Sequence, residues 1–127
     1  MIDANNAYWV VGNEGFTGES AGAVKKVPLA GGTIVTLAVN NDATIVNIDP
    51  ADPVALAVDA TNVYWVNYGS ASVFSVPIGG GTPVTLATQN AGDPYLYQPN
   101  AIAVDGTSVY VAATGQTTGA ILKVAPK

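Results

Sequence analysis

Two features of this 127-residue chain are of a kind that could carry chemistry: a run of three glycines and a set of acidic, amide and aromatic residues. The stretch VPIGGGTPVTLA places the glycines at 79–81, and a glycine-rich loop cradles phosphate groups where it opens a helix. The other residues stand in irregular segments, and the set expected to form a ligand-binding face is Asn13, Glu14, Phe16, Glu19, Asn47, Asp49, Asp52, Asp93, Tyr95, Tyr97 and Gln98. Carboxylates, amides and aromatic rings suit a hard cation such as calcium or a small neutral polar ligand; the alternative is that they are solvated loop residues.

The composition excludes several classes of function. The chain has no histidine and no cysteine, so Ser-His and Cys-His nucleophiles, disulfides and thiolate metal sites are excluded. The net charge is −5 and lysine is the sole basic residue type. Such a chain would repel a phosphate backbone, so nucleic acid is not an expected partner.

The sequence indicates a chain that is not held in a membrane. No stretch approaches the roughly 20 apolar residues of a membrane-spanning helix. The opening MIDAN has neither a basic leader nor an apolar signal core. We expect a soluble protein of unknown compartment, secreted or periplasmic if a leader has been removed.

The glycine stretch is one member of an internal repeat. VPLAGGTIVTLA at 27–38 matches it position by position, and a second unit recurs as IDANNAYWV, VDATNVYWV and VDGTSVYVA. In each copy of this second unit an aspartate precedes a tyrosine by five positions: Asp3 and Tyr8, Asp59 and Tyr64, Asp105 and Tyr110. Repeats at intervals of about fifty residues indicate a propeller, a solenoid or an array. No helical pattern follows the glycines, so they are predicted to supply a hairpin turn instead of a phosphate loop.

Each repeat reads as four short strands. Runs such as ALAV, VYWV, SVFSV and PVTLA are apolar, rich in β-branched residues and bounded by turn residues. The predicted fold is therefore all-β: four-stranded antiparallel meanders forming a partial β-propeller over 1–127. The first blade covers about 1–40 with only a stub of its inner strand, the second about 54–88, and the third about 100–127 without its outer strand.

The pattern P-x-x-I-A-V-D-x-x-x-V-Y-W-V followed by V-P-x-x-G-G-T-x-V-x-L-A resembles the NHL and gluconolactonase (SMP-30-like) group of six-bladed β-propellers. In that group an asparagine in the Pro-Asn opening of a blade reaches a divalent cation in the central channel. The resemblance places Asn100 at this position, although Val54 stands there in the second unit. Asp52 and Asp93, each before a proline, are the acidic candidates. The resemblance also implies an alternative function, metal-dependent hydrolysis of lactones or phosphotriesters.

The chain is too short to close a ring. Propellers need about four to eight blades, and fewer than three are present. Open sheet edges invite association, so we predict a homodimer that completes a six-bladed ring. The alternative is an engineered or truncated half-propeller without activity.

An antiparallel meander also predicts where a binding site would lie. The long irregular segments at 12–22, 40–53, 89–99 and 114–119 all connect strands at the same end of the blades. Loops on a rigid scaffold commonly carry binding residues. The predicted function is ligand or partner binding on this face. The repeated aspartates are predicted to be turn residues, and the Tyr-Trp pairs to pack between blades.

Overall fold

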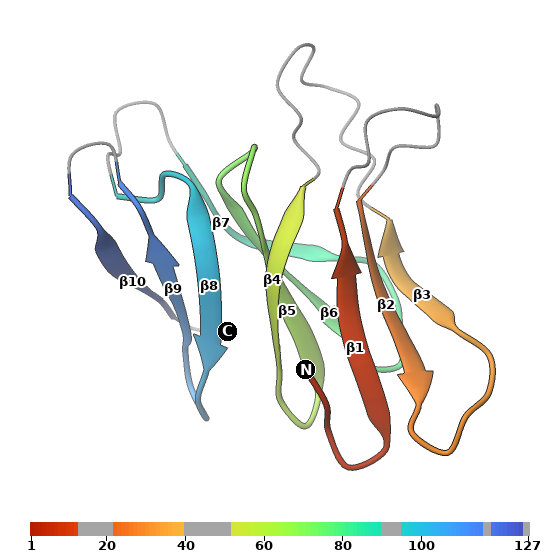
Figure 1. Ribbon diagram of the computed structural model, residues 1–127. Coiled ribbons are helices and arrows are strands. Elements are labelled where there is room, and N and C mark those ends of the chain that lie inside the picture. The colour runs from red at the N-terminus through yellow and green to blue at the C-terminus, as the bar shows by residue number, and fades with distance from the viewer. Residues whose placement is uncertain (13–21, 40–51, 90–94, 116–117, 126–127) are drawn as a thin grey trace.

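The computed structural model describes residues 1–12, 22–39, 52–89, 95–115 and 118–125. Every regular element of these residues is a β-strand (Figure 1). The strands are β1 (Asn6–Val11), β2 (Ala23–Pro28), β3 (Val35–Val39), β4 (Pro53–Val58), β5 (Asn62–Asn67), β6 (Ser72–Pro77), β7 (Val84–Thr88), β8 (Pro99–Val104), β9 (Val109–Ala113) and β10 (Ala120–Val124). No helix of the described residues is long and apolar enough to cross a membrane.

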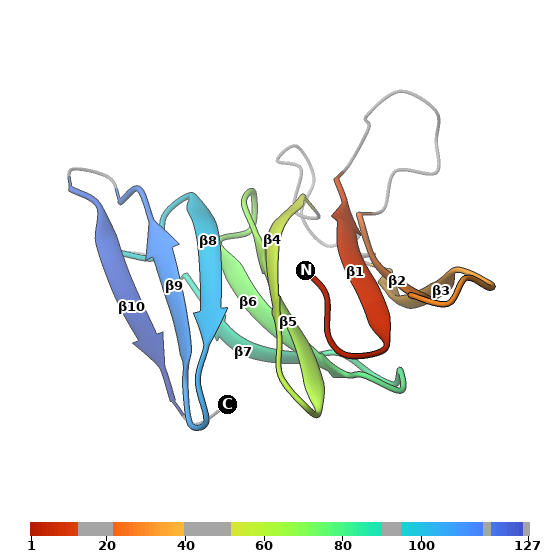
Figure 2. The same cartoon turned by 60° about the horizontal axis from the view of Figure 1, so that its bottom comes forward.

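The strands form three antiparallel sheets, ordered β1-β2-β3, β4-β5-β6-β7 and β10-β9-β8. Each sheet is a meander in which consecutive strands pair. Strand β4 contacts β1 on one side and β8 on the other, so the three sheets stand side by side (Figures 1 and 2). The predicted all-β fold of partial β-propeller blades is confirmed. The first sheet has no full inner strand among the described residues, and a single bridge between Ile2 and Ala7 takes its place.

The repeated glycines form the turns between β2 and β3 in the first sheet and between β6 and β7 in the second. Gly80 and Gly81 have φ values of 91° and 143°, and Gly31 and Gly32 have 85° and 138°. The last glycine of each turn has a φ that L-residues with a side chain rarely adopt. The hairpin interpretation is therefore confirmed, and no helix follows either turn in the described residues.

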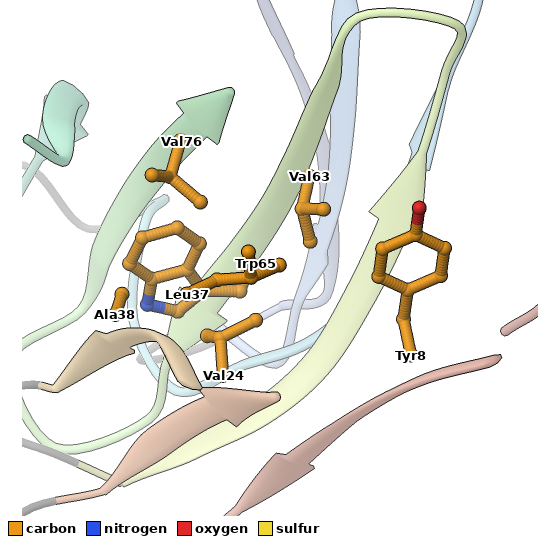
Figure 3. Packing of buried hydrophobic residues seen from close by; sticks show 7 residues of the cluster. All are labelled: Tyr8, Val24, Leu37, Ala38, Val63, Trp65 and Val76. Atoms are coloured by element: carbon orange, nitrogen blue, oxygen red, sulfur yellow. The ribbon is translucent and has the colours of Figure 1, made fainter. Parts of the chain in front are cut away.

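The core lies between the sheets, in two clusters of buried side chains. The first cluster joins Tyr8, Val24, Leu37 and Ala38 of the first sheet to Val63, Trp65 and Val76 of the second (Figure 3). The second cluster joins Tyr64, Val66, Ala71 and Val73 to Leu96 and to Val109 and Val111 of the third sheet. The ring of Trp65 stacks on Phe74 with centroids 5.4 Å apart. Tyr8, Tyr64 and Trp65 thus pack between blades as predicted, whereas Trp9 belongs to neither cluster. Burial between sheets is what stabilises the fold.

Candidate functional site

The strand directions place the strand ends that flank the irregular segments at one end of the sheets. Strands β1, β5 and β9 finish at this end, and β4 and β8 begin there, as the upper part of Figure 1 shows. We call it the loop end, and the opposite end, which carries the aspartate and glycine turns, the turn end. Of the predicted binding residues, Asp52, Tyr95, Tyr97 and Gln98 are described and lie at the loop end. The others, Asn13, Glu14, Phe16, Glu19, Asn47, Asp49 and Asp93, lie outside the described residues.

A cavity of about 260 Å³ opens at the loop end where the second sheet meets the third. Three segments line it: the turn between β5 and β6 with Tyr68, Gly69 and Ala71, the residue after β7, Gln89, and Tyr97 and Gln98 just before β8. Two of the predicted residues are thus brought together here. Tyr68 and Ala71 were missed because the β5–β6 turn is short, although the meander places this turn at the same end as the long segments.

The backbone of the cavity wall is held by a hydrogen bond between two of these segments and by another from Thr114, which follows β9. The amide of Gln89 donates to the carbonyl of Ala71 at 3.0 Å. The carbonyl of Gln98 accepts from the Thr114 hydroxyl at 3.1 Å, and the buried side chain of Leu96 anchors the 95–98 segment in the second cluster. The wall is therefore fixed by the fold before any ligand arrives.

Two residues of this wall adopt an unusual backbone conformation. Ala71 and Gln98 have φ values of 46° and 49°, and they are the described non-glycine residues with positive φ. This conformation costs an L-residue roughly 1–2 kcal/mol. Such costs gather at binding sites, where the surrounding structure enforces them. Both residues line the same cavity, which singles it out from the other hollows of the described surface.

The remaining described candidates lie apart from this cavity. Tyr95 is 57% exposed and does not line it. Asp52 lies where the first and second sheets meet, and its carbonyl accepts from the amide of Tyr68 at 2.9 Å. A Cβ added to Gly12 would come within 2.7 Å of the Asp52 carboxylate, so this carboxylate lies directly against the glycine.

The structure bears on the predicted calcium site only at the described residues. Asn100 is exposed on β8 and lines a hollow of about 390 Å³ together with residues of β9 and β10. Carboxylates are the ligands that calcium prefers, but no group of three or more acidic, histidine or cysteine side chains gathers anywhere in the described residues. Calcium binding at Asn100, Asp52 and Asp93 stays a prediction, and no metal chemistry is derived from it.

At the turn end, the three repeated aspartates share one geometry. In each copy Oδ1 accepts two backbone N–H groups of the turn, and Oδ2 accepts the tyrosine hydroxyl. At Asp59 the amides of Thr61 and Asn62 donate at 2.8 Å each, and the hydroxyl of Tyr64 donates at 2.9 Å. The corresponding hydroxyl distances are 2.6 Å for Tyr8 to Asp3 and 2.8 Å for Tyr110 to Asp105.

The protonation equilibria of these pairs follow from the same contacts. The hydroxyl of Tyr8 lowers the pKa of Asp3, with the turn amides adding to the effect. The amide of Thr107, followed by the hydroxyl of Tyr110, lowers the pKa of Asp105. Burial, reinforced by the aspartate hydrogen bond, raises the pKa of Tyr8 and of Tyr64 to about 12. Ionised aspartates that accept hydrogen bonds from neutral tyrosines stabilise the turns. This confirms the structural role predicted for the aspartates.

Comparisons with known proteins support the fold. No protein-family model matches the chain, and no curated protein matches it either. Among solved structures, the chain is similar to one described as a nidogen/laminin complex, with a TM-score of 0.68 and 18% sequence identity. The match covers 94% of this chain and 39% of that chain, so this chain spans about two fifths of its length. A likeness at this identity is one of fold, and it supports a β-propeller-like architecture for this chain.

Proposed function

We propose that this chain is a binding module and that its loop end receives a protein partner, one of whose side chains enters the cavity between the second and third sheets. The observation that carries the proposal is a cavity with walls fixed by hydrogen bonds and lined by two residues with positive φ. Its volume of about 260 Å³ is below the roughly 300–1,000 Å³ of pockets for drug-sized ligands. A single partner side chain suits this space better than a free small molecule.

The lining indicates what such a side chain would be. Tyr68 and Tyr97 offer aromatic rings, and Gln89 and Gln98 offer amide groups that both donate and accept. Tyrosine is enriched at protein interfaces because its ring is large and apolar while its hydroxyl bonds to polar groups. The chain carries a net charge of −5, which favours a neutral or basic partner surface. An aromatic or amide side chain on such a surface fits the cavity best.

The structural neighbour is compatible with this reading. Its description names a complex of nidogen with laminin, that is, a protein bound to a protein. A small polar ligand is the competing occupant of the same cavity. Peptide binding would identify a protein partner as the occupant, and glycan binding would identify a small polar ligand.

The experiment compares two tyrosines of one segment. A phage-displayed random peptide library is selected on the 127-residue chain, and a glycan array is screened in parallel. Selected peptides are then titrated calorimetrically against Tyr97→Ala and Tyr95→Ala. Tyr97 lines the cavity and Tyr95 does not, so we expect the first change to weaken binding about tenfold or more, as for an anchored aromatic residue, and the second to leave it unchanged. Glycan binding without peptide binding would show that the cavity receives a sugar and would refute the protein partner. Failure to select any Tyr97-dependent binder would refute the proposal.

A further inference from the structure

The first and third sheets each present one face that no other described sheet covers. Side chains of a strand alternate between its two faces. In β1, Tyr8 and Val10 belong to the cluster shared with the second sheet, so Ala7, Trp9 and Val11 face away from it. In β9, Val109 and Val111 belong to the other shared cluster, so its intervening residues face away in the opposite direction. These two faces, the first-sheet flank and the third-sheet flank, are where neighbouring blades would pack.

The third-sheet flank is apolar and hollowed. A hollow of about 150 Å³ is lined by Ala101, Ile102, Ala103, Tyr110, Ala112 and Ile121. Ile121 is 74% exposed, the largest exposure among the large apolar side chains of the described residues. Covering such a surface would be favourable by the hydrophobic effect alone.

The same surface occurs twice more in the chain, and in both places another sheet covers it. The cross-strand pairs of the flank are Tyr110 with Lys123 and Ala112 with Ile121. The pairs at the matching positions of the first sheet are Tyr8 with Lys26 and Val10 with Val24, and those of the second sheet are Tyr64 with Ser75 and Val66 with Val73. The buried members of those sets form the two core clusters. The flank therefore has the make-up of a third blade junction, and no sheet of the described residues supplies its other half.

The first-sheet flank supplies a matching half. At the first junction the side chain that enters from the second sheet is Trp65, which is 1% exposed (Figure 3). The repeat aligns AYWVV at 7–11 with VYWVN at 63–67, so Trp9 occupies the position of Trp65. Trp9 faces away from its own cluster and is only half-buried. An indole on one open flank and an apolar hollow on the other are complementary.

We propose that a second copy of this chain packs its first sheet on the third-sheet flank and places its Trp9 in the hollow beside Tyr110 and Ile121, while the reciprocal contact forms at the other junction. Each copy contributes three sheets. Two copies of these 127 residues give a ring of six, within the roughly four to eight blades that close a propeller. The assembly does not depend on the partner binding proposed for the loop end.

A hydrogen bond already present inside the chain specifies the register of this junction. Lys26 Nζ donates to the carbonyl oxygen of Ile78 at 2.6 Å, from the first sheet to the second. Lys123 occupies the position of Lys26 in the third sheet, opposite Tyr110. Leu29 occupies the position of Ile78, since the amides of Leu29 and Ile78 donate to the carbonyls of Asn5 and Thr61 in equivalent turns. Lys123 of one copy then donates to the carbonyl of Leu29 of the other.

The test replaces an exposed residue of the flank, so that the folding of the single chain is preserved. Ile121→Glu places a charge where the proposed junction is apolar and is expected to weaken association about 100-fold or more, as for an unpaired buried charge. Lys123→Met removes the proposed bond to Leu29 and is expected to weaken association about tenfold. Val84→Glu is the matched control, since Val84 is 55% exposed on β7, away from both flanks.

Light scattering at tens of micromolar gives the molar mass, and acrylamide quenching reports the two tryptophans. We expect the unmodified chain and Val84→Glu to have twice the 12.8 kDa of one chain, and Ile121→Glu to have the mass of one. Trp65 is buried in the single chain, so acrylamide should reach Trp9 in Ile121→Glu and neither tryptophan in the dimer. A folded unmodified chain with the mass of one copy, a dimer that persists in Ile121→Glu, or an assembly larger than two copies would overturn the proposal.

Discussion

Removing the carboxylate of Asp59 tests whether the repeated aspartate–tyrosine pairs stabilise the fold. The Asp59→Ala change deletes the acceptor of the Tyr64 hydroxyl, which lies 2.9 Å away on a side chain that is 1% exposed. Depriving a buried hydroxyl of its acceptor costs roughly 1–3 kcal/mol. Two turn amides also lose their acceptor, which by analogy with helix caps costs about 1 kcal/mol more. We expect the free energy of unfolding to fall by about 2–4 kcal/mol.

A double-mutant cycle separates the pair from its surroundings. Tyr64→Phe removes the hydroxyl with its bonds to Asp59 and to the Asn62 side chain, and is expected to cost about 1–2 kcal/mol. The double variant with Asp59→Ala should lose at least about 0.5 kcal/mol less than the sum of the single losses. Asp59→Asn is the control, because its amide oxygen still accepts the turn amides. Urea unfolding followed by circular dichroism at one fixed protein concentration gives the four values, since assembly changes apparent stability. Additive losses, or a loss below about 0.5 kcal/mol for Asp59→Ala, would refute the reasoning.

Three further predictions concern the turns, the pH dependence and the metal. Gly81→Ala should cost roughly 1–3 kcal/mol in urea unfolding because of its φ of 143°, whereas Gly79→Ala, with open space around its Cβ and no positive φ, should be neutral; equal effects would contradict the turn assignment. The pKa values of Tyr8 and Tyr64 are raised to about 12, so the unfolded chain ionises first. The contribution of these two tyrosines to the free energy of unfolding is complete below pH 10 and lost toward pH 12. A free energy of unfolding that stays constant across this pH range would exclude it. A calcium site that includes Asn100 predicts a melting temperature raised by millimolar calcium and restored by EDTA; no shift in the unmodified chain would remove the site.

The fold could be predicted from the sequence because its determinants are local. An aspartate five residues before a tyrosine folds into a turn in which every hydrogen bond to the aspartate carboxylate spans at most five positions. Gly80 and Gly81 predict a hairpin because residues without a side chain tolerate the positive φ of its turn. The alternation in VYWV assigns residues to opposite faces of a strand. Each of these signals survives in a single repeat. Comparing the repeats then assigns each turn and strand to its position in the blade.

The cavity could be predicted only in part because it is made by three segments that are distant in sequence. Tyr97 and Gln98 stand in a conspicuous irregular stretch, but Tyr68 and Ala71 come from a turn of ordinary length. The positive φ of Ala71 is invisible in the sequence, since alanine gives no hint of it where glycine would. How the turn meets Tyr97 and Gln98 depends on the packing of the second sheet against the third, which no local pattern encodes.

The cavity also follows from one of the places where the third unit departs from the repeat. Val111 stands where the first two units have Trp9 and Trp65. At the junction of the second and third sheets, Val111 shares its cluster with Leu96, which is 3% exposed and comes from the segment just before β8. An indole at 111 would compete with Leu96 for this space, because protein interiors are close-packed. The smaller valine thus allows Leu96 to anchor the 95–98 segment, and that segment carries Tyr97 and Gln98 to the cavity. The repeated residues thus build the junctions between sheets, and Val111, which differs from Trp9 and Trp65, makes room for the site.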